Sequence, residues 1–345
     1  MKTKLSVAAM ALLLASCSSN DNDLLPENPV NATPIQVSQS VQGMVKTRAA
    51  VGVGSDVTAT VLVADGSSNN ADAADWANFS PVLANEVTED GGQNKLTTRA
   101  TVSTASFKAG SKATVSLNPI LYYHTTAGTK SWLAAVAPAG TVSGTTVTIP
   151  QTDGEQDVML ANSTAAGSST STSAPELTFK HLTTQLNFEM KVTAQNGGEW
   201  TDKTISLKKI SVRNAQVPVE VNVAPASGKA GVSKWTDAAM MNVGGISSVA
   251  LGADAVRVGN PLMIQASGQV VIDAVISVGG TDITFSNVTI KKQDNTTNLS
   301  TEAGKSHLIT LNVTEPLTPE DATKMTVTAT VTDWVAGDAG KADLN

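Results

Sequence analysis

The residues that most often carry enzyme chemistry are few in this sequence, and their spacing does not favour catalysis. The three histidines, His124, His181 and His307, lie in different segments, with no HxH or HExxH spacing. Gly52 and Gly54 are not followed by a helical pattern, and no GxSxG motif occurs. The sequence predicts no catalytic residues, and His181 is interpreted as a packed or hydrogen-bonded core residue.

Two further groups of residues could bind a metal ion or a carbohydrate: the acidic residues near position 155 and the tryptophans. Asp153, Glu155 and Asp157 alternate, but the glycine and terminal glutamate of a calcium-binding loop do not follow. We therefore predict no metal site and no cofactor. The five tryptophans would form a glycan-stacking platform if exposed, and core anchors if buried. We interpret all five as core anchors. They are Trp76, Trp132, Trp200, Trp235 and Trp334.

Composition favours an all-β fold. The chain has 345 residues, which is enough for two domains, and 41% of them are hydrophobic although only 3% are aromatic. Val, Thr, Ser and Gly are abundant, as in strands joined by tight turns. The formal net charge of −7 argues against a nucleic-acid partner, which would require a basic surface.

The single cysteine, Cys17, lies at the end of an export signal. Lys2 and Lys4 precede an apolar stretch over residues 5–15 that is too short to span a membrane as a helix. Leu14-Ala-Ser-Cys17 resembles the lipobox of bacterial lipoproteins. This resemblance implies that Cys17 becomes the mature N-terminus and carries lipid such as palmitate. An ordinary secretory signal with an incidental cysteine is the alternative.

The following residues 18–23 (SSNDND) resemble the export tag of surface lipoproteins in the Bacteroidetes. Residues 18–34 contain three prolines and are predicted to form a tether. We expect the chain at the cell outer membrane, exposed at the surface.

Short strands are predicted along the rest of the chain, with no convincing helical period. Leu177 and Phe179 are out of phase with Leu182 and Leu186, which predicts a bulge or bend near His181. Residues 163–174 are predicted to form a surface loop, and 238–246 a short helical turn. The predicted strands cover residues 35–41, 57–63, 113–121, 131–137, 145–149, 182–192, 217–223, 269–278, 281–290, 307–313 and 325–335.

Several segments together resemble the fimbrillin family of Bacteroidales pili. They are the lipobox, Pro150-Gln-Thr-Asp153 with Gln156–Ala161, Leu177–Phe188, Ala303–Ser306, and Val331–Trp334 with Gly337 and Gly340. The resemblance implies two tandem transthyretin-like Greek-key β-sandwich domains and a non-enzymatic structural or tip subunit of a fimbria. The expected divisions are a signal peptide (1–16), a tether with a removable strand (17–48), and domains over 49–197 and 198–345.

The family resemblance also implies maturation by an arginine-specific protease and polymerisation by strand exchange. Cutting between Arg48 and Ala49 would release strand 35–41 with the lipid, and Arg99–Ala100 is a second, less favoured site. The last strand, over 324–335, is the expected donor, with Met325, Val327, Ala329 and Val331 as the side chains that enter the groove. It is equally open that this strand completes its own domain.

The expected partners are other fimbrial subunits, the outer membrane through Cys17 before processing, and a host or bacterial surface ligand that supports adhesion. The alternative from another class is a monomeric, surface-exposed glycan-binding lipoprotein. An enzyme is the third and weakest reading.

Overall fold

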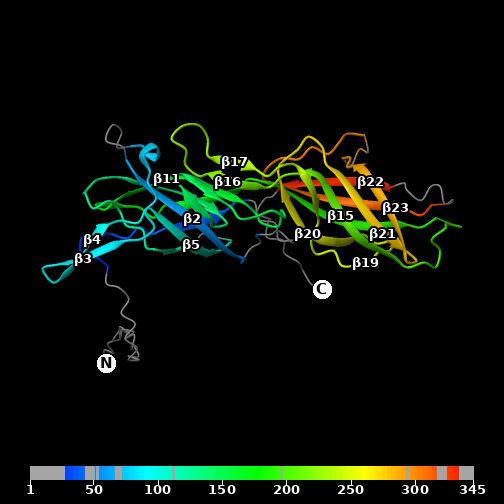
Figure 1. Cartoon of the computed structure of the whole chain (residues 1–345), viewed down its shortest axis with the longest axis horizontal. Coiled ribbons are helices and arrows are strands. Elements are labelled where there is room, and N and C mark those ends of the chain that lie inside the picture. The colour runs from blue at the N-terminus through cyan, green and yellow to red at the C-terminus, as the bar shows by residue number, and fades with distance from the viewer. Residues whose placement is uncertain are drawn as a thin grey trace, which may run out of the picture.

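The computed structural model describes residues 28–42, 51, 54–66, 72–110, 113–195, 197–292, 294, 296–316 and 325–333, the last as backbone alone, as are 113–114. The fold is all-β, as predicted, and consists of strands apart from one turn of 3-10 helix, η1 (Trp76–Asn78). Within these ranges, no helix is long and apolar enough to cross a membrane. The molecule is elongated, with the earlier strands at one end and the later strands at the other (Figure 1).

The first part of the chain forms one nine-stranded sheet, called here the N-terminal sheet. Its strand order is β6-β1-β13-β11-β8-β2-β5-β7, with β12 paired to β11. Because β6 and β7 flank Val115, the two ends of this order meet and the sheet returns on itself around an interior core. Its strands are β1 (Ser38–Val41), β2 (Asp56–Asp65), β5 (Val102–Lys108), β6 (Ala113–Thr114), β7 (Ser116–Asn118), β8 (Ser131–Ala137), β11 (Met159–Ser168), β12 (Ser171–Thr172) and β13 (Glu176–His181).

A four-stranded sheet, β17-β16-β10-β9, covers the outer face of the N-terminal sheet. Its strands are β9 (Thr141–Ser143), β10 (Thr146–Thr148), β16 (Pro218–Asn222) and β17 (Gly231–Trp235). Val147 and Val221, which are partners across β10 and β16, pack with Leu62, Ala134 and Leu160 of the N-terminal sheet. A separate hairpin, β3 (Glu86–Asp90) with β4 (Gln93–Thr98), projects at the end of the molecule away from the later strands (Figure 1).

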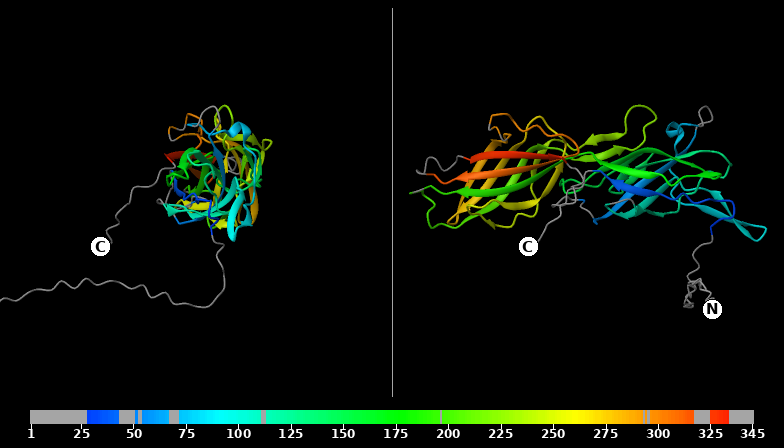
Figure 2. Two further views of the ribbon diagram at one scale, coloured as in Figure 1. Left: turned by 90° about the vertical axis from the view of Figure 1, so that its left-hand side faces the viewer. Right: turned by 180° about the vertical axis from the view of Figure 1, so that it is seen from behind.

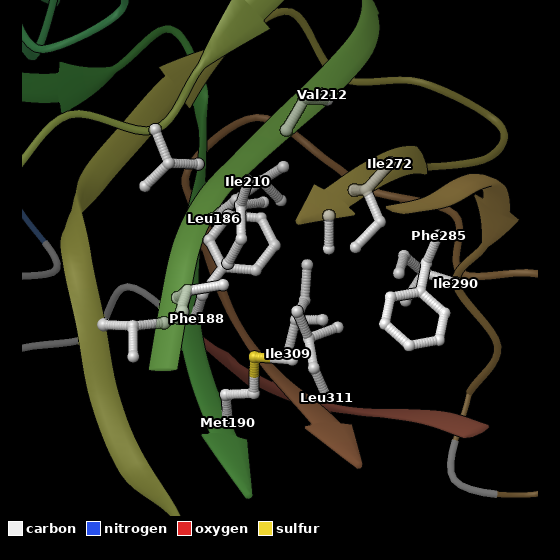
Figure 3. Close-up of a cluster of buried hydrophobic side chains, with 14 of the residues drawn as sticks. Leu186, Phe188, Met190, Ile210, Val212, Ile272, Phe285, Ile290, Ile309 and Leu311 are labelled. Carbon is white, nitrogen blue, oxygen red and sulfur yellow. The ribbon is translucent and has the colours of Figure 1, made fainter. Parts of the chain in front are cut away.

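The later strands form a sandwich, called here the C-terminal sandwich. One sheet has the order β20-β14-β23-β24 and the other β18-β15-β21-β22, with β19 paired to β15. Their inward side chains meet in one core, in which Phe188, Ile272 and Ile309 lie together (Figure 3). The strands are β14 (Thr184–Thr193), β15 (Ile205–Ala215), β18 (Ala239–Asn242), β19 (Val249–Ala250), β20 (Val256–Ile264), β21 (Val271–Val278), β22 (Thr281–Thr289), β23 (Lys305–Thr314) and β24 (Met325–Asp333).

The phase break near His181, where the sequence predicts a bulge or bend, marks a change of sheet. Leu177 and Phe179 belong to the core of the N-terminal sheet, whereas Leu186 belongs to the core of the C-terminal sandwich. The chain therefore changes sheet between His181 and Thr184, and each strand follows its own alternation. The predicted division at residue 197 falls after β14, although β14 already pairs within the C-terminal sandwich.

Two further segments differ from expectation. Residues 163–174, predicted as a loop, contain the end of β11 and the strand β12, paired through Gly167 and Thr172. Residues 238–246, predicted as a helical turn, contain β18, which pairs with β15. The predicted hairpin over 269–290 is confirmed, with Gly279 and Gly280 at the turn, both at positive φ.

The two motifs of residues 150–161 and 177–188 meet at a buried hydrogen bond between Asp157 and His181. Asp157 lies just before β11 and His181 ends β13, and Met159 is the partner of His181 in the β11–β13 ladder. His181 Nδ1 lies 2.9 Å from a carboxylate oxygen of Asp157, and both side chains are almost fully buried. This contact supports the interpretation of His181 as a hydrogen-bonded core residue.

Candidate functional site: the slot of the N-terminal strand

The segment around β1 lies between two other parts of the N-terminal sheet and is hydrogen-bonded on both sides. On one side β1 runs parallel to β13, with Ser38 opposite Glu176 and Val41 opposite Phe179. Beyond the strand, the Gln42 amide donates to the Phe179 carbonyl at 2.9 Å.

On its other side the segment follows residues 113–123. The Ile35 amide donates to the Leu121 carbonyl at 2.8 Å, and the Val115 amide donates to the Val37 carbonyl at 2.9 Å. The Tyr123 amide donates to the Thr33 carbonyl at 2.9 Å. Removing the segment would therefore leave two rows of unpaired backbone groups facing one another, which is the geometry of a strand acceptor.

The inward face of the segment is buried in the sheet's core. Ile35 is 4% exposed, Val37 2% and Val41 5%, and all three pack in the same cluster. These are the three inward residues that the alternation predicted. The cluster includes the stacked rings of Phe107 and Phe179, whose centroids lie 5.3 Å apart.

A fourth inward residue, Gln39, was missed because its side chain is polar. It is fully buried, and its Nε2 donates to the Lys108 carbonyl at 2.9 Å. Among the described residues, its Oε1 has no hydrogen-bond partner. Position alone could have identified it, since Gln39 lies two residues from both Val37 and Val41 and shares their face.

The residues ahead of the strand lie against the β3–β4 hairpin. The Val30 amide donates to the Asn94 carbonyl at 3.0 Å. The Asn31 side chain makes two hydrogen bonds to the backbone of Leu96. Its Nδ2 donates to the Leu96 carbonyl at 3.1 Å, and its Oδ1 accepts from the Leu96 amide at 2.8 Å. The N-terminal segment thus contacts the sheet and the hairpin together.

The predicted processing and lipidation sites have different positions relative to this segment. Cys17, Arg48 and Ala49 lie outside the described residues. Arg99 lies after β4, and its guanidinium forms a pair with Asp65 at 2.6 Å and donates to the Tyr122 carbonyl. Ala100 is fully buried. A protease would need local unfolding to bind the Arg99–Ala100 bond in an extended form.

The predicted donor strand is β24, which pairs antiparallel with β23 at the edge of its sheet, with Met325 opposite Val313 and Val331 opposite His307. In this structure it therefore completes its own sandwich. The side chains of Met325, Val327, Ala329 and Val331 and the residue Trp334 lie outside what the structure describes.

His307 lies on β23 beside this edge strand, opposite Val331, and is buried at 1% exposure. Within the described part of the chain, neither of its ring nitrogens has a hydrogen-bond partner. Burial disfavours the imidazolium and lowers the pKa of His307 to about 4. The ring is therefore neutral at neutral pH and acts as a packing residue.

The tryptophans and the alternating acidic residues Asp153 and Asp157 take part in packing and hydrogen bonding within the fold. Trp76, Trp132 and Trp200 are buried whereas Trp235 is only half-buried, and the Trp76 Nε1 donates to Ser163 at 3.1 Å. The Asp153 side chain accepts from the Glu155 amide, while Asp157 pairs with His181. Among the described residues, no cluster of three or more His, Cys, Asp or Glu is arranged for a metal ion.

A site built from backbone hydrogen bonds and apolar side chains suits a structural protein that binds a β-strand. The chain belongs to the fimbrillin-like family, whose model matches residues 59–334. It is a structural, non-enzymatic protein of the fimbrial type, and its place is the cell surface. No curated protein sequence matches the chain.

The chain is also similar to several solved structures. A putative cell adhesion protein from Bacteroides uniformis is 15% identical, with a TM-score of 0.46 over 87% of this chain and 98% of that one. A fimbrial protein from Bacteroides vulgatus is 12% identical, with a TM-score of 0.40 over 87% and 99%. A fimbrilin from Porphyromonas gingivalis is 13% identical, with a TM-score of 0.41 over 90% and 100%.

Proposed function

We propose that the protein is exported as a lipoprotein with lipid on Cys17, and that it polymerises into a fimbria after cleavage between Arg48 and Ala49. The lipid would anchor the precursor in the outer membrane. Cleavage would separate the segment around β1 from the rest of the chain. The last strand of another subunit would then take its place, and the fibre would support adhesion as a structural or tip subunit.

One observation carries this proposal: the segment ahead of Arg48 is a central part of the N-terminal sheet. It has hydrogen-bond partners on both sides and buries three apolar side chains. At about 1.5–3 kcal/mol for each, these side chains contribute roughly 5–9 kcal/mol before ordering costs. With a burial free energy of this size, binding of another strand in the empty slot is favoured over exposure of the slot to water.

Cleavage would start the strand exchange but would not by itself release the segment. A cut after Arg48 does not itself break a hydrogen bond of the segment that ends at Gln42. The cut segment is held by noncovalent contacts and must be displaced. Arg48 suits this role better than Arg99, because a cut at Arg99 would follow β4 and divide the folded body.

The alternative of a monomeric glycan-binding lipoprotein has less support. A stacking platform requires exposed aromatic rings, whereas Trp76, Trp132 and Trp200 are packed inside.

The test is to treat the purified precursor and its Arg48→Ala variant with an arginine-specific protease. We expect a ladder of detergent-resistant oligomers from the wild type and monomers from Arg48→Ala. Arg99→Ala serves as the matched control and should polymerise. A cleaved wild type that stays monomeric would overturn the proposal, and retention of that monomer on a polysaccharide column would favour the glycan binder.

A further inference from the structure

The N-terminal segment and the last strand share a sequence pattern that sets the register of the exchange. Residues 26–41 (PENPVNATPIQVSQSV) align without a gap with residues 316–331 (PLTPEDATKMTVTATV), at a constant separation of 290 positions. The identical pairs are Pro26 and Pro316, Pro29 and Pro319, Ala32 and Ala322, Thr33 and Thr323, Val37 and Val327, and Val41 and Val331. At average residue usage, roughly one identity would be expected over such a length.

We infer that the acceptor site takes residues 318–331 of a second copy, with residue n + 290 in the place of residue n, and that it extends beyond the slot onto the backbone of β4. This inference rests on the proposed strand exchange and specifies its register, its direction and the length of the site.

The alternation of the two segments agrees in this register. The buried positions Ile35, Val37 and Val41 correspond to Met325, Val327 and Val331. The partly exposed Ser38 and Ser40 correspond to Thr328 and Thr330, which are also small and hydroxylated. A shift of one residue would place threonines in the core, so only even shifts compete.

The fourth buried position makes the two occupants unequal. Gln39 brings an amide oxygen that lacks a partner among the described residues, whereas its counterpart is Ala329. A buried acceptor without a hydrogen bond is destabilising. Ala329 would remove this unpaired acceptor and would also lose the bond from Gln39 Nε2 to the Lys108 carbonyl, so the two occupants differ in polar contacts at this position.

The part of the site on the hairpin also has counterparts. The Ala32 amide donates to the Pro29 carbonyl and closes a turn, and both of these residue types recur at 319 and 322. Asn31, which holds Leu96, corresponds to Asp321, whose carboxylate can accept from the Leu96 amide. The exposed Val30 corresponds to Glu320, a residue suited to solvent.

The direction follows from where the two strands begin. Met325 pairs with Val313 at the end of β23 that lies away from the N-terminal sheet, because β14 enters from that sheet and runs parallel to β23. The slot is entered at residues 33–35, away from the crossover at residue 182 (Figure 2). A strand leaving one end of a subunit thus enters the opposite end of the next. Such a head-to-tail contact gives a filament where its rotation does not close into a ring.

The register is tested with paired cysteines in a Cys17→Ser background, which has no other cysteine. The acceptor carries Glu176→Cys, the partner of Ser38, and separate donors carry Thr326→Cys, Thr328→Cys or Thr330→Cys. After protease treatment of the mixtures we expect a disulfide-linked dimer with Thr328→Cys only. Moving the acceptor cysteine to Thr178→Cys, the partner of Ser40, should move the cross-link to Thr330→Cys. Pairs two residues out of register are too far apart to bridge.

The outcomes separate this inference from the proposed function. A cross-link at Thr326→Cys or Thr330→Cys with Glu176→Cys, or polymers without any cross-link, would overturn the register while leaving polymerisation in place. An absence of polymers after cleavage would overturn both.

The hairpin part of the site is tested by hydrogen exchange of residues 93–98. We expect protection in the precursor and in the polymer, and about tenfold faster exchange of the Leu96 amide in Asp321→Ala polymers, because that amide loses its acceptor. The matched control is Glu320→Ala, which should match the wild type. Equal exchange in wild-type and Asp321→Ala polymers would overturn the extension of the site onto β4.

Discussion

Val37→Ala isolates how strongly the N-terminal segment is held, because in the proposed exchange Val37 leaves with that segment and would be absent from the polymer. Its side chain is 2% exposed and lies in the core of the N-terminal sheet. The substitution removes about two methylene equivalents, at about 0.8 kcal/mol each, and leaves a small cavity. We expect the precursor to lose about 2 kcal/mol of unfolding free energy.

The same loss should appear in the kinetics of assembly. Since about 1.4 kcal/mol corresponds to a factor of ten, release of the cut segment should be up to roughly 30-fold faster. The assay measures the unfolding of the intact precursor in urea, and then the half-time of polymer formation after protease treatment. Gln36→Ala, at an exposed position of the same segment, is the matched control and should change stability by less than about 0.5 kcal/mol.

Two results would refute this reasoning. A precursor unchanged by Val37→Ala would mean that the segment is not held by the core. A destabilised precursor that assembles at the wild-type rate would mean that release of the segment does not limit assembly.

Three further predictions concern residues outside the segment. Lowering the pH from 6.5 towards 4 should destabilise the C-terminal sandwich by about 3 kcal/mol. The reason is that the unfolded chain protonates His307 near pH 6.5, whereas the folded chain protonates it only near its pKa of about 4. Urea unfolding followed by the buried Trp200 checks this, and a His307→Leu variant that retains the full pH dependence would contradict it. Asp157→Ala should cost about 2 kcal/mol, because it leaves the buried Nδ1 of His181 without its hydrogen-bond partner; a urea midpoint equal to the wild type would exclude that role. Val327→Asp should leave cleavage intact and prevent polymerisation, because a charge would enter the Val37 pocket, and oligomers at the wild-type level on a detergent gel would argue against β24 as donor.

The strands could be predicted from the sequence because alternation is a local property. Val57 to Val63 and the hairpin at Gly279-Gly280 fold as their patterns indicate. The phase break between Phe179 and Leu186 was also visible, but its cause was not, since periodicity does not tell which sheet a strand joins. The pairing of β10 with β16 could not be predicted from the local pattern either, because it joins residues about seventy positions apart.

The candidate site was predicted in part for the same reason. The inward set of Ile35, Val37 and Val41 followed from alternation, whereas Gln39 was left out because a buried amide contradicts the usual rule for polar residues. The contact of Asn31 with Leu96 could not be predicted, since it depends on how the hairpin folds back over the segment. The match between residues 26–41 and 316–331 was present in the sequence, but its register gained meaning only when the buried positions were known.

The central claim is that the segment ahead of Arg48 leaves its slot when subunits join. Denaturing mass spectrometry of washed polymers tests it directly, because a retained segment would appear as a separate N-terminal fragment ending at Arg48. The account predicts that this fragment is absent from polymers and present in the supernatant. Its presence in polymers at one copy per subunit would contradict strand exchange.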